Sequence, residues 1–227
     1  MIRVGVIDSG GPLTDHANDG HGHVAFGPDG CQTTVTPDRL GHGTAVAGII
    51  RRACPPVQIR HAQVFDERPV TSALRVAAAL DWLQGLPEAD RPHLVCLSLG
   101  LRADRAVLRE ACARLTANGM VLVAAHPAQG EACFPAAYPR VLAATGDARC
   151  GWDDLSMPRP DVIGAWCNSP EHGQVGMGGA SIGAARIVGH LAVMMARQGT
   201  LAPVQAFRAL ADRCLILGPE RRKLAHG

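Results

Sequence analysis

The sequence alternates short, continuous apolar runs with longer stretches of helical character. Strand-like runs occupy residues 3–8, 57–65, 93–99, 120–125 and 140–145. They are apolar throughout rather than at every second residue, as expected for parallel strands covered on both faces. Helices are predicted over residues 44–52, 70–84, 104–117, 181–198 and 203–211, with a loop-rich stretch around Pro158, Pro160 and Pro170. This alternation predicts βαβ units, and therefore an α/β fold in three layers around a mainly parallel central sheet.

Composition and charge exclude several classes of partner. The chain has 227 residues, of which 47% are hydrophobic and 19% charged, as in an ordinary globular protein of one domain. Its formal net charge of +2 is spread along the sequence. We therefore expect no nucleic-acid partner and no membrane partner, because neither a basic patch nor a run of membrane-spanning length is present. The sequence does not indicate an oligomeric state.

The amino-terminal residues and the cysteines point to a reducing compartment. Residues 1–7 read as a buried strand, and no secretory signal precedes them, so we expect a cytoplasmic protein. None of the eight cysteines has the C-x-x-C spacing of a zinc knuckle or a thioredoxin-type site. A cytosolic protein normally keeps its thiols reduced. We therefore predict eight free thiols.

Three segments carry polar residues where structure alone does not call for them. Residues 6–10 (VIDSG) end a buried strand with Asp8, and residues 41–48 (GHGTAVAG) open a helix with His42. Residues 178–185 (GGASIGAA) place Ser181 at the start of a long apolar helix. The carboxyl ends of strands and the amino-terminal ends of helices lie at one edge of such a sheet. The three side chains are therefore expected to face one cleft.

The chemistry of these three side chains is complementary. A serine hydroxyl is a weak nucleophile until a neighbouring imidazole accepts its proton. The imidazole in turn needs a buried carboxylate that fixes its tautomer and stabilises the imidazolium. Taken singly, Asp8 is equally explained as a turn former, His42 as a residue at a helix start and Ser181 as a helix cap. Their order along the chain, Asp then His then Ser, is that of one known catalytic triad and favours the catalytic interpretation.

The three segments resemble the catalytic signatures of the subtilase family of serine peptidases. The resemblance extends to residues 97–100 (LSLG), 138–143 (YPRVLA) and 161–165 (DVIGA). It implies a subtilisin-like α/β/α fold in which Ser181 is the nucleophile, His42 the general base and acid, and Asp8 its orienting partner. It also implies that a peptide substrate adds as a strand against Ser98, Leu99 and Gly100. We predict no cofactor and no metal ion.

The sequence departs from the family at the oxyanion site. Subtilases place an asparagine in an Ala-Ala-x-Gly-Asn segment, and residues 124–130 (AAHPAQG) put Ala128 at that position. An alanine side chain donates no hydrogen bond, and removing such a donor costs about 10²–10³ in turnover. Gln129 and His126 are candidate substitutes, although His126 is better explained as a pocket-lining residue. Gln129 borders the expected substrate pocket, and as an uncharged residue it mildly disfavours a basic requirement there.

A second departure concerns the start of the chain and the residues around Ser181. The chain starts at the aspartate strand, so we interpret residues 1–227 as a single peptidase domain with no propeptide. Ala180 stands where threonine is usual, and Ala185 and Arg186 stand where proline and histidine usually follow.

The two main departures, the missing oxyanion asparagine and the missing propeptide, favour a slow, selective endopeptidase that processes a particular peptide or protein through an acyl-enzyme. Small subtilases encoded beside modified-peptide pathways, which remove leader segments, are similar. The alternative is a catalytically impaired subtilase that binds a peptide without cutting it.

Residues 15–23 are dense in possible metal ligands. Their His-x-His spacing suits a transition metal, and their Asp and Asn oxygens suit calcium, but the EF-hand pattern is lacking. We interpret the segment as a polar loop near the cleft and predict no metal site.

Overall fold

A computed structural model describes residues 1–12, 22–168 and 176–219. Within them, one sheet of ten strands has the order β10-β8-β9-β7-β6-β5-β1-β4-β2-β3. The strands are β1 (Arg3–Asp8), β2 (His23–Phe26), β3 (Gln32–Thr33), β4 (Gln58–Gln63), β5 (Leu94–Leu97), β6 (Val121–Ala125), β7 (Leu142–Gly146), β8 (Leu155–Arg159), β9 (Val162–Ala165) and β10 (Ile216–Leu217). Neighbouring strands are parallel except in the pairs β2–β3 and β8–β9. The predicted α/β fold with a mainly parallel sheet is confirmed.

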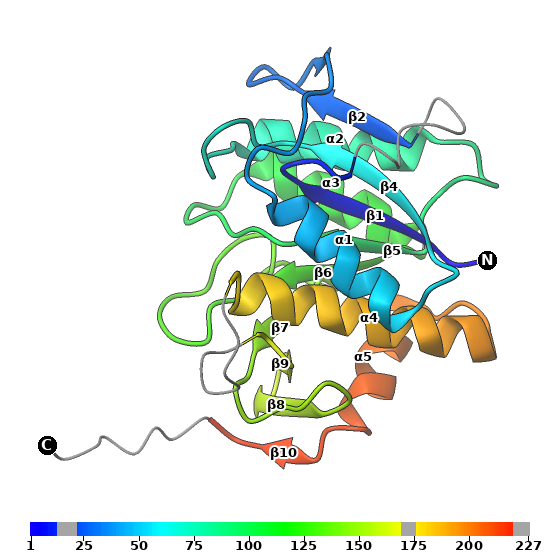
Figure 1. The fold of residues 1–227 in the computed structure, drawn as a ribbon, viewed down its shortest axis with the longest axis vertical. Helices are drawn as coiled ribbons and strands as arrows, with labels where there is room; N and C mark the ends of the chain where they lie inside the picture. The colour runs from blue at the N-terminus through cyan, green and yellow to red at the C-terminus, as the bar shows by residue number, and fades with distance from the viewer. Residues whose placement is uncertain (13–21, 169–175, 220–227) are drawn as a thin grey trace, which may run out of the picture.

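Five helices form the two outer layers in the described part of the chain. They are α1 (His42–Ala53), α2 (Ala73–Gly85), α3 (Ala106–Ala117), α4 (Ala180–Gln198) and α5 (Pro203–Ala211). One core cluster joins the sheet to α1, α4 and α5, and a second joins it to α2 and α3. Figure 1 shows α1 and α4 crossing the front of the sheet, with α2 and α3 behind it. Because both faces are covered, the central strands are apolar throughout, as their sequences indicate.

The predicted elements are all present, with shifted ends. Helix α1 begins at His42, two residues before the predicted start, so His42 is part of the helix. Helix α2 begins three residues late because the Ser72 hydroxyl accepts a hydrogen bond from the Arg75 N–H and caps the helix there. The stretch expected to be loop-rich contains β8, which includes Pro158. This proline is tolerated where the β8–β9 pairing is irregular, between Ser156 and Arg159.

Two close approaches between backbones fix the starts of α1 and α4 against the sheet. A Cβ atom added to Gly43 would lie 2.1 Å from the carbonyl oxygen of Gly10, which follows β1. A Cβ atom added to Gly183 would lie 2.2 Å from the carbonyl oxygen of Thr145 in β7. Only glycine permits either approach, since real Cβ contacts do not occur at such distances. The first turn of each helix therefore lies directly on the carboxyl end of a strand.

The remaining sequence expectations have mixed outcomes. All eight cysteines are free thiols, as predicted. Within the described residues no helix has the length and apolar character needed to cross a membrane. Of the segment rich in possible metal ligands, residues 15–21 lie outside the described part of the chain, and His23 is a buried residue of β2.

Candidate active site

Asp8 and His42 form a closely bonded pair at the carboxyl end of β1. Asp8 is the last residue of β1 and is only 1% exposed, while His42 is the first residue of α1. The Nδ1 atom of His42 lies 2.8 Å from Oδ1 and 2.9 Å from Oδ2 of Asp8. The hydrogen bond to Asp8 raises the pKa of His42, although burial opposes the shift, and the charges of Asp8 and Asp38 add to it. With Nδ1 directed at the carboxylate, Nε2 is left to exchange a proton with another group.

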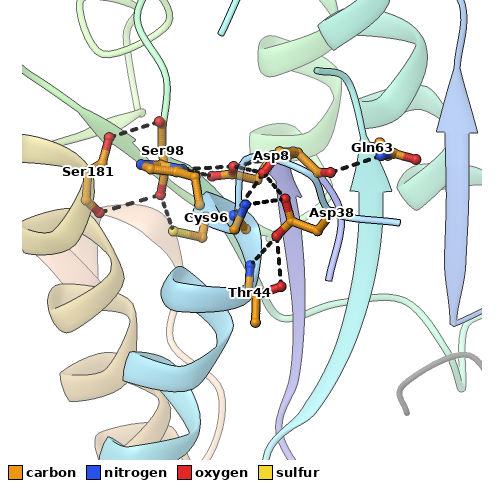
Figure 2. Close-up of polar contacts among 11 residues, drawn as sticks. Asp8, Asp38, Thr44, Gln63, Cys96, Ser98 and Ser181 are labelled. Carbon is orange, nitrogen blue, oxygen red and sulfur yellow. Dashed lines mark hydrogen bonds and ion pairs between the residues drawn. The ribbon is translucent and has the colours of Figure 1, made fainter. Parts of the chain in front are cut away.

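A second carboxylate, that of Asp38, lies behind this pair. Its Oδ1 atom accepts hydrogen bonds from the Gly41 N–H and the Ser9 hydroxyl, both at 2.8 Å. Its Oδ2 atom accepts from the Thr44 N–H at 2.8 Å and the Thr44 hydroxyl at 2.7 Å. Burial on its own raises the pKa of Asp38, but hydrogen bonds from Thr44, Ser9 and Gly41 outweigh burial and hold that pKa below its ordinary value. Figure 2 shows Asp38 between Asp8 and Thr44.

Ser181 lies in the first turn of α4, beside the end of β5. Its hydroxyl donates a hydrogen bond to the backbone carbonyl of Ser98 at 2.9 Å, rather than to His42. The Ser98 hydroxyl in turn lies 3.4 Å from the Ser181 carbonyl oxygen and 3.3 Å from the thiol of Cys96 (Figure 2). Backbone N–H groups in a first turn have no partner within the helix, so the N–H of Ser181 is available to an oxyanion.

All three residues of the predicted triad line one cavity of about 880 Å³. Asp8, His42 and Ser181 line it together with Ser98, Leu99 and Gly100, as the sequence predicts for a substrate cleft. Arg102 adds a cation to the lining. Most of the other lining residues are apolar, namely Leu40, Phe65, Pro69, Val70, Leu101 and Met177. A cavity of this size and character suits an extended peptide with apolar side chains.

Ala128 and Gln129 lie elsewhere. Both are exposed and line a separate, smaller cavity of about 130 Å³. His126 is only 5% exposed, its Nδ1 atom lies 2.8 Å from the Pro127 carbonyl oxygen, and it lines neither cavity. The structure therefore brings three of the five predicted substrate-binding residues to the triad, and places the other two along a neighbouring loop.

Sequence reasoning missed Asp38. An aspartate just before the start of a helix is a common capping signal, and that signal was present four positions before His42. A capping role alone would not have revealed that the same carboxylate also contacts Ser9, because that contact depends on how α1 packs on β1.

The structure explains the arginine that replaces the usual histidine after Ser181. Arg186 is 3% exposed, and its Nε atom donates to the Trp152 carbonyl at 2.6 Å. Its guanidinium lies 4.3 Å from the centre of the Trp152 ring, and its Nη2 atom lies 3.1 Å from Oδ1 of Asp153. Burial lowers the pKa of Arg186 to about 10, although the charge of Asp153 opposes the shift. Arg186 thus anchors α4 to the segment before β8, which a histidine is too short to do in the same way.

Comparison with known proteins gives distant relatives and a similar fold. The chain is 30% identical over 154 residues to the minor extracellular protease Epr of Bacillus subtilis strain 168, covering 63% of this chain and 23% of that protein. It is 26% identical over 237 residues to the alkaline elastase YaB of Bacillus sp. strain YaB, covering 96% of this chain and 60% of that protein. The chain thus spans less than two thirds of either relative. No protein-family model matches it.

The fold comparison covers nearly the whole chain. A crystal structure of a cold-adapted subtilisin-like serine proteinase superposes with a TM-score of 0.71 at 18% identity, over 98% of this chain and 89% of that one. The fold is therefore subtilisin-like, as the sequence resemblance implies.

Proposed function

We propose that this chain, a distant relative of the subtilisin-like serine proteases with their fold, is a serine endopeptidase. Ser181 is the nucleophile, His42 the general base and acid, and Asp8 the carboxylate that orients His42. The observation that carries the proposal is the 2.8 Å contact between His42 and Asp8 in a cavity that Ser181 also lines. The residues between 1 and 219 that the structure describes form one peptidase domain in this proposal.

Catalysis needs one local rearrangement. The Ser181 side chain rotates from the Ser98 carbonyl toward Nε2 of His42, which takes the hydroxyl proton as the serine oxygen attacks the peptide carbonyl. His42 then returns that proton to the leaving amine as the peptide C–N bond breaks. Water hydrolyses the resulting acyl-enzyme with His42 again as the base. Catalytic hydrogen bonds are often absent or long in unliganded sites, so the resting position of Ser181 is compatible with this sequence of steps.

The residues around the cleft favour a slow and selective enzyme. Ala128, at the position where the family carries its oxyanion donor, has no donating side chain and lines a separate cavity, which leaves the backbone N–H of Ser181 as the identified donor. The largely apolar cleft favours an extended segment with apolar side chains. We propose limited processing of a specific peptide or protein, such as removal of a leader segment. A similar small subtilase accompanies maturation of quinohemoprotein amine dehydrogenase, whose small subunit carries a leader, and it serves as a model for such a role.

The free thiols support a cytoplasmic location in this proposal. None of the eight cysteines, all of which lie in the described residues, forms a disulfide bond, and several are buried in the core. Unpaired thiols persist in reducing compartments, whereas secreted proteins commonly oxidise them. The relative Epr carries the word extracellular in its name, so the location proposed here differs from that protein's.

The rival function is that of a subtilase that binds a peptide without cutting it. Two observations favour this rival. The Ser181 hydroxyl is hydrogen-bonded to Ser98 instead of His42, and Ala128 stands where the sequence alignment expects an oxyanion donor.

A fluorophosphonate probe separates the two functions, because it reacts covalently with an activated serine. We expect the wild-type protein to gain the mass of one phosphonyl group, located at Ser181 by peptide mass spectrometry. The Ser181→Ala variant, with thermal unfolding as its folding control, should gain none. A folded wild-type protein that remains unlabelled supports the peptide binder, and equal labelling of the alanine variant places the nucleophile elsewhere.

A further inference from the structure

One carboxylate is bonded to both sides of the His42–Asp8 pair. On the helix side, Asp38 accepts hydrogen bonds from the backbone N–H of Gly41, which directly precedes α1, and from that of Thr44 in the first turn of the helix. On the strand side, Asp38 accepts the hydroxyl of Ser9, the residue that directly follows Asp8. Each of these three bonds is 2.8 Å long.

The Ser9 hydroxyl completes the connection. It lies 3.2 Å from Oδ1 of Asp8 and also accepts the N–H of Gly43 at 2.9 Å. Ser9 is fully buried, so water does not compete for these bonds. The strand end that carries Asp8 and the helix turn that carries His42 therefore share a closed set of hydrogen bonds centred on Asp38 (Figure 2).

We propose that Asp38 is a positioning residue for the peptidase reaction, holding the His42 imidazole and the Asp8 carboxylate in their mutual orientation through Gly41, Thr44 and Ser9. This inference rests on the proposed function, and it adds a fourth residue to the three of the triad. Asp38 does not line the cavity that holds the triad, so it acts through its neighbours and not on substrate.

The use of both carboxylate oxygens distinguishes this role from ordinary helix capping. A cap requires one side-chain oxygen and one or two N–H groups of the helix. Oδ2 of Asp38 accepts from the N–H and the hydroxyl of Thr44, and Oδ1 accepts from both the Gly41 N–H and the Ser9 hydroxyl. An asparagine has one acceptor oxygen and a donating amide group, so it can serve only one of these two sets of donors.

The charge of Asp38 reaches His42 as well. The hydrogen bond to Asp8 is the main cause of the raised pKa of His42, burial opposes it, and the charges of Asp8 and Asp38 add to the rise. These two carboxylates are the charged groups that act on His42 among the described residues. An uncharged side chain at position 38 is thus expected to lower the pKa of His42.

The test compares Asp38→Asn and Ser9→Ala with the wild type. We expect Asp38→Asn to slow fluorophosphonate labelling at saturating probe by about 10-fold or more, with the half-saturating probe concentration unchanged, because misplaced reacting groups cost rate and not affinity. Ser9→Ala leaves the Asp38 bonds to α1 intact and should give a smaller loss in the same direction. Asp104→Asn is the matched control, since it removes a carboxylate near the start of α3 that contacts Tyr138.

A spectroscopic measurement makes the test independent of catalysis. In the wild type, the Nδ1 proton of His42 should give a downfield proton resonance, and titration should show a His42 pKa above its ordinary value. Asp38→Asn should weaken or shift that resonance upfield and lower the pKa of His42, whereas Asp104→Asn should do neither. An unlabelled wild type with this signature contradicts the peptidase and not the positioning role. Normal labelling and an unchanged His42 resonance in folded Asp38→Asn overturn the inference.

Discussion

The two halves of the candidate site are held in different ways. The acid–base half, comprising Asp8, His42, Ser9 and Asp38, is joined by several hydrogen bonds of 2.7 to 2.8 Å and one contact of 3.2 Å between the Ser9 hydroxyl and Asp8. The nucleophile half has one short bond, from the Ser181 hydroxyl to the Ser98 carbonyl, and one long contact of 3.4 Å between the same two residues. The difference indicates that the proton-accepting groups are preorganised, whereas substrate must complete the arrangement around the nucleophile.

The largest expected effect comes from breaking the acid–base half at its centre. Asp8→Asn should slow labelling of Ser181 by about 10⁴-fold, because an amide favours the wrong tautomer of the histidine and does not stabilise the imidazolium. The rate is measured from the time course of probe incorporation, with circular dichroism as the folding control. A loss of less than about 10-fold would show that this half is not the base of the reaction.

The two halves differ in hydrogen bonding, but the helix start in each half is packed equally closely against a strand. Adding a Cβ atom there should therefore destabilise the fold by a similar amount in both halves. Gly43→Ala and Gly183→Ala each force a Cβ atom against a backbone carbonyl, and each should lower the free energy of unfolding by about 3 kcal/mol. Gly48→Ala is the control, because nothing lies within 4 Å of its added Cβ. Its greater helix propensity should stabilise the protein by up to about 1 kcal/mol. Urea unfolding measures all three, and a neutral Gly183→Ala would mean that α4 adjusts where α1 does not.

Adding a donor should strengthen the nucleophile half. Ala128→Asn is expected to speed labelling by about 10-fold, less than the 10²–10³ associated with such a donor in a site built around it. The reduced gain reflects the position of Ala128, which lines the smaller neighbouring cavity. Ala128→Ser offers a shorter donor for comparison. If both variants label at the wild-type rate, the loop after β6 does not face the oxyanion.

The smallest expected effect is a shift along the pH axis. Labelling needs neutral His42, and the hydrogen bond to Asp8 raises the pKa of His42 above its ordinary 6.5. The rate should therefore fall as pH decreases through that raised pKa, with a midpoint above 6.5. Stability runs the other way, because the protonated pair stabilises the folded state below the unfolded pKa and loses that contribution as pH rises through the folded one. A labelling midpoint at or below the ordinary value would contradict the Asp8 contact.

The regular elements of the fold were predictable because burial is visible in the apolar character of neighbouring residues within each element. The continuous apolar sequences of β6 and of the long helix α4 each indicate an element that is buried on several sides. The edge strand β10 was not predictable, since it pairs with β8, which is far away in sequence. The edge strand β3 was not predictable because it has only two residues, both polar and exposed, and so carries no apolar run. Strand β8 was missed for another reason: Pro158 indicates a loop, and pairing with β9 overrides that local preference.

The site was predictable only in part for a related reason. Asp8, His42 and Ser181 each lie in a glycine-containing segment that resembles a catalytic signature of the subtilase family, so this resemblance is enough to identify them. The role of Ala128 was inferred from an ungapped alignment, which gives no position in space, and the structure puts this residue beside a separate cavity. The contact of Asp38 with Ser9 spans 29 residues and leaves no local pattern.

The packing of α4 against α1 has a consequence for the order of events during synthesis. Asp8 and His42 leave the ribosome before Ser181, which arrives with α4 after nine strands of the sheet have been made. Until α4 docks across α1, a growing chain holds a base without a nucleophile. If the chain is the peptidase proposed above, the nascent protein is unable to cut itself or its neighbours until translation of most of the domain is finished.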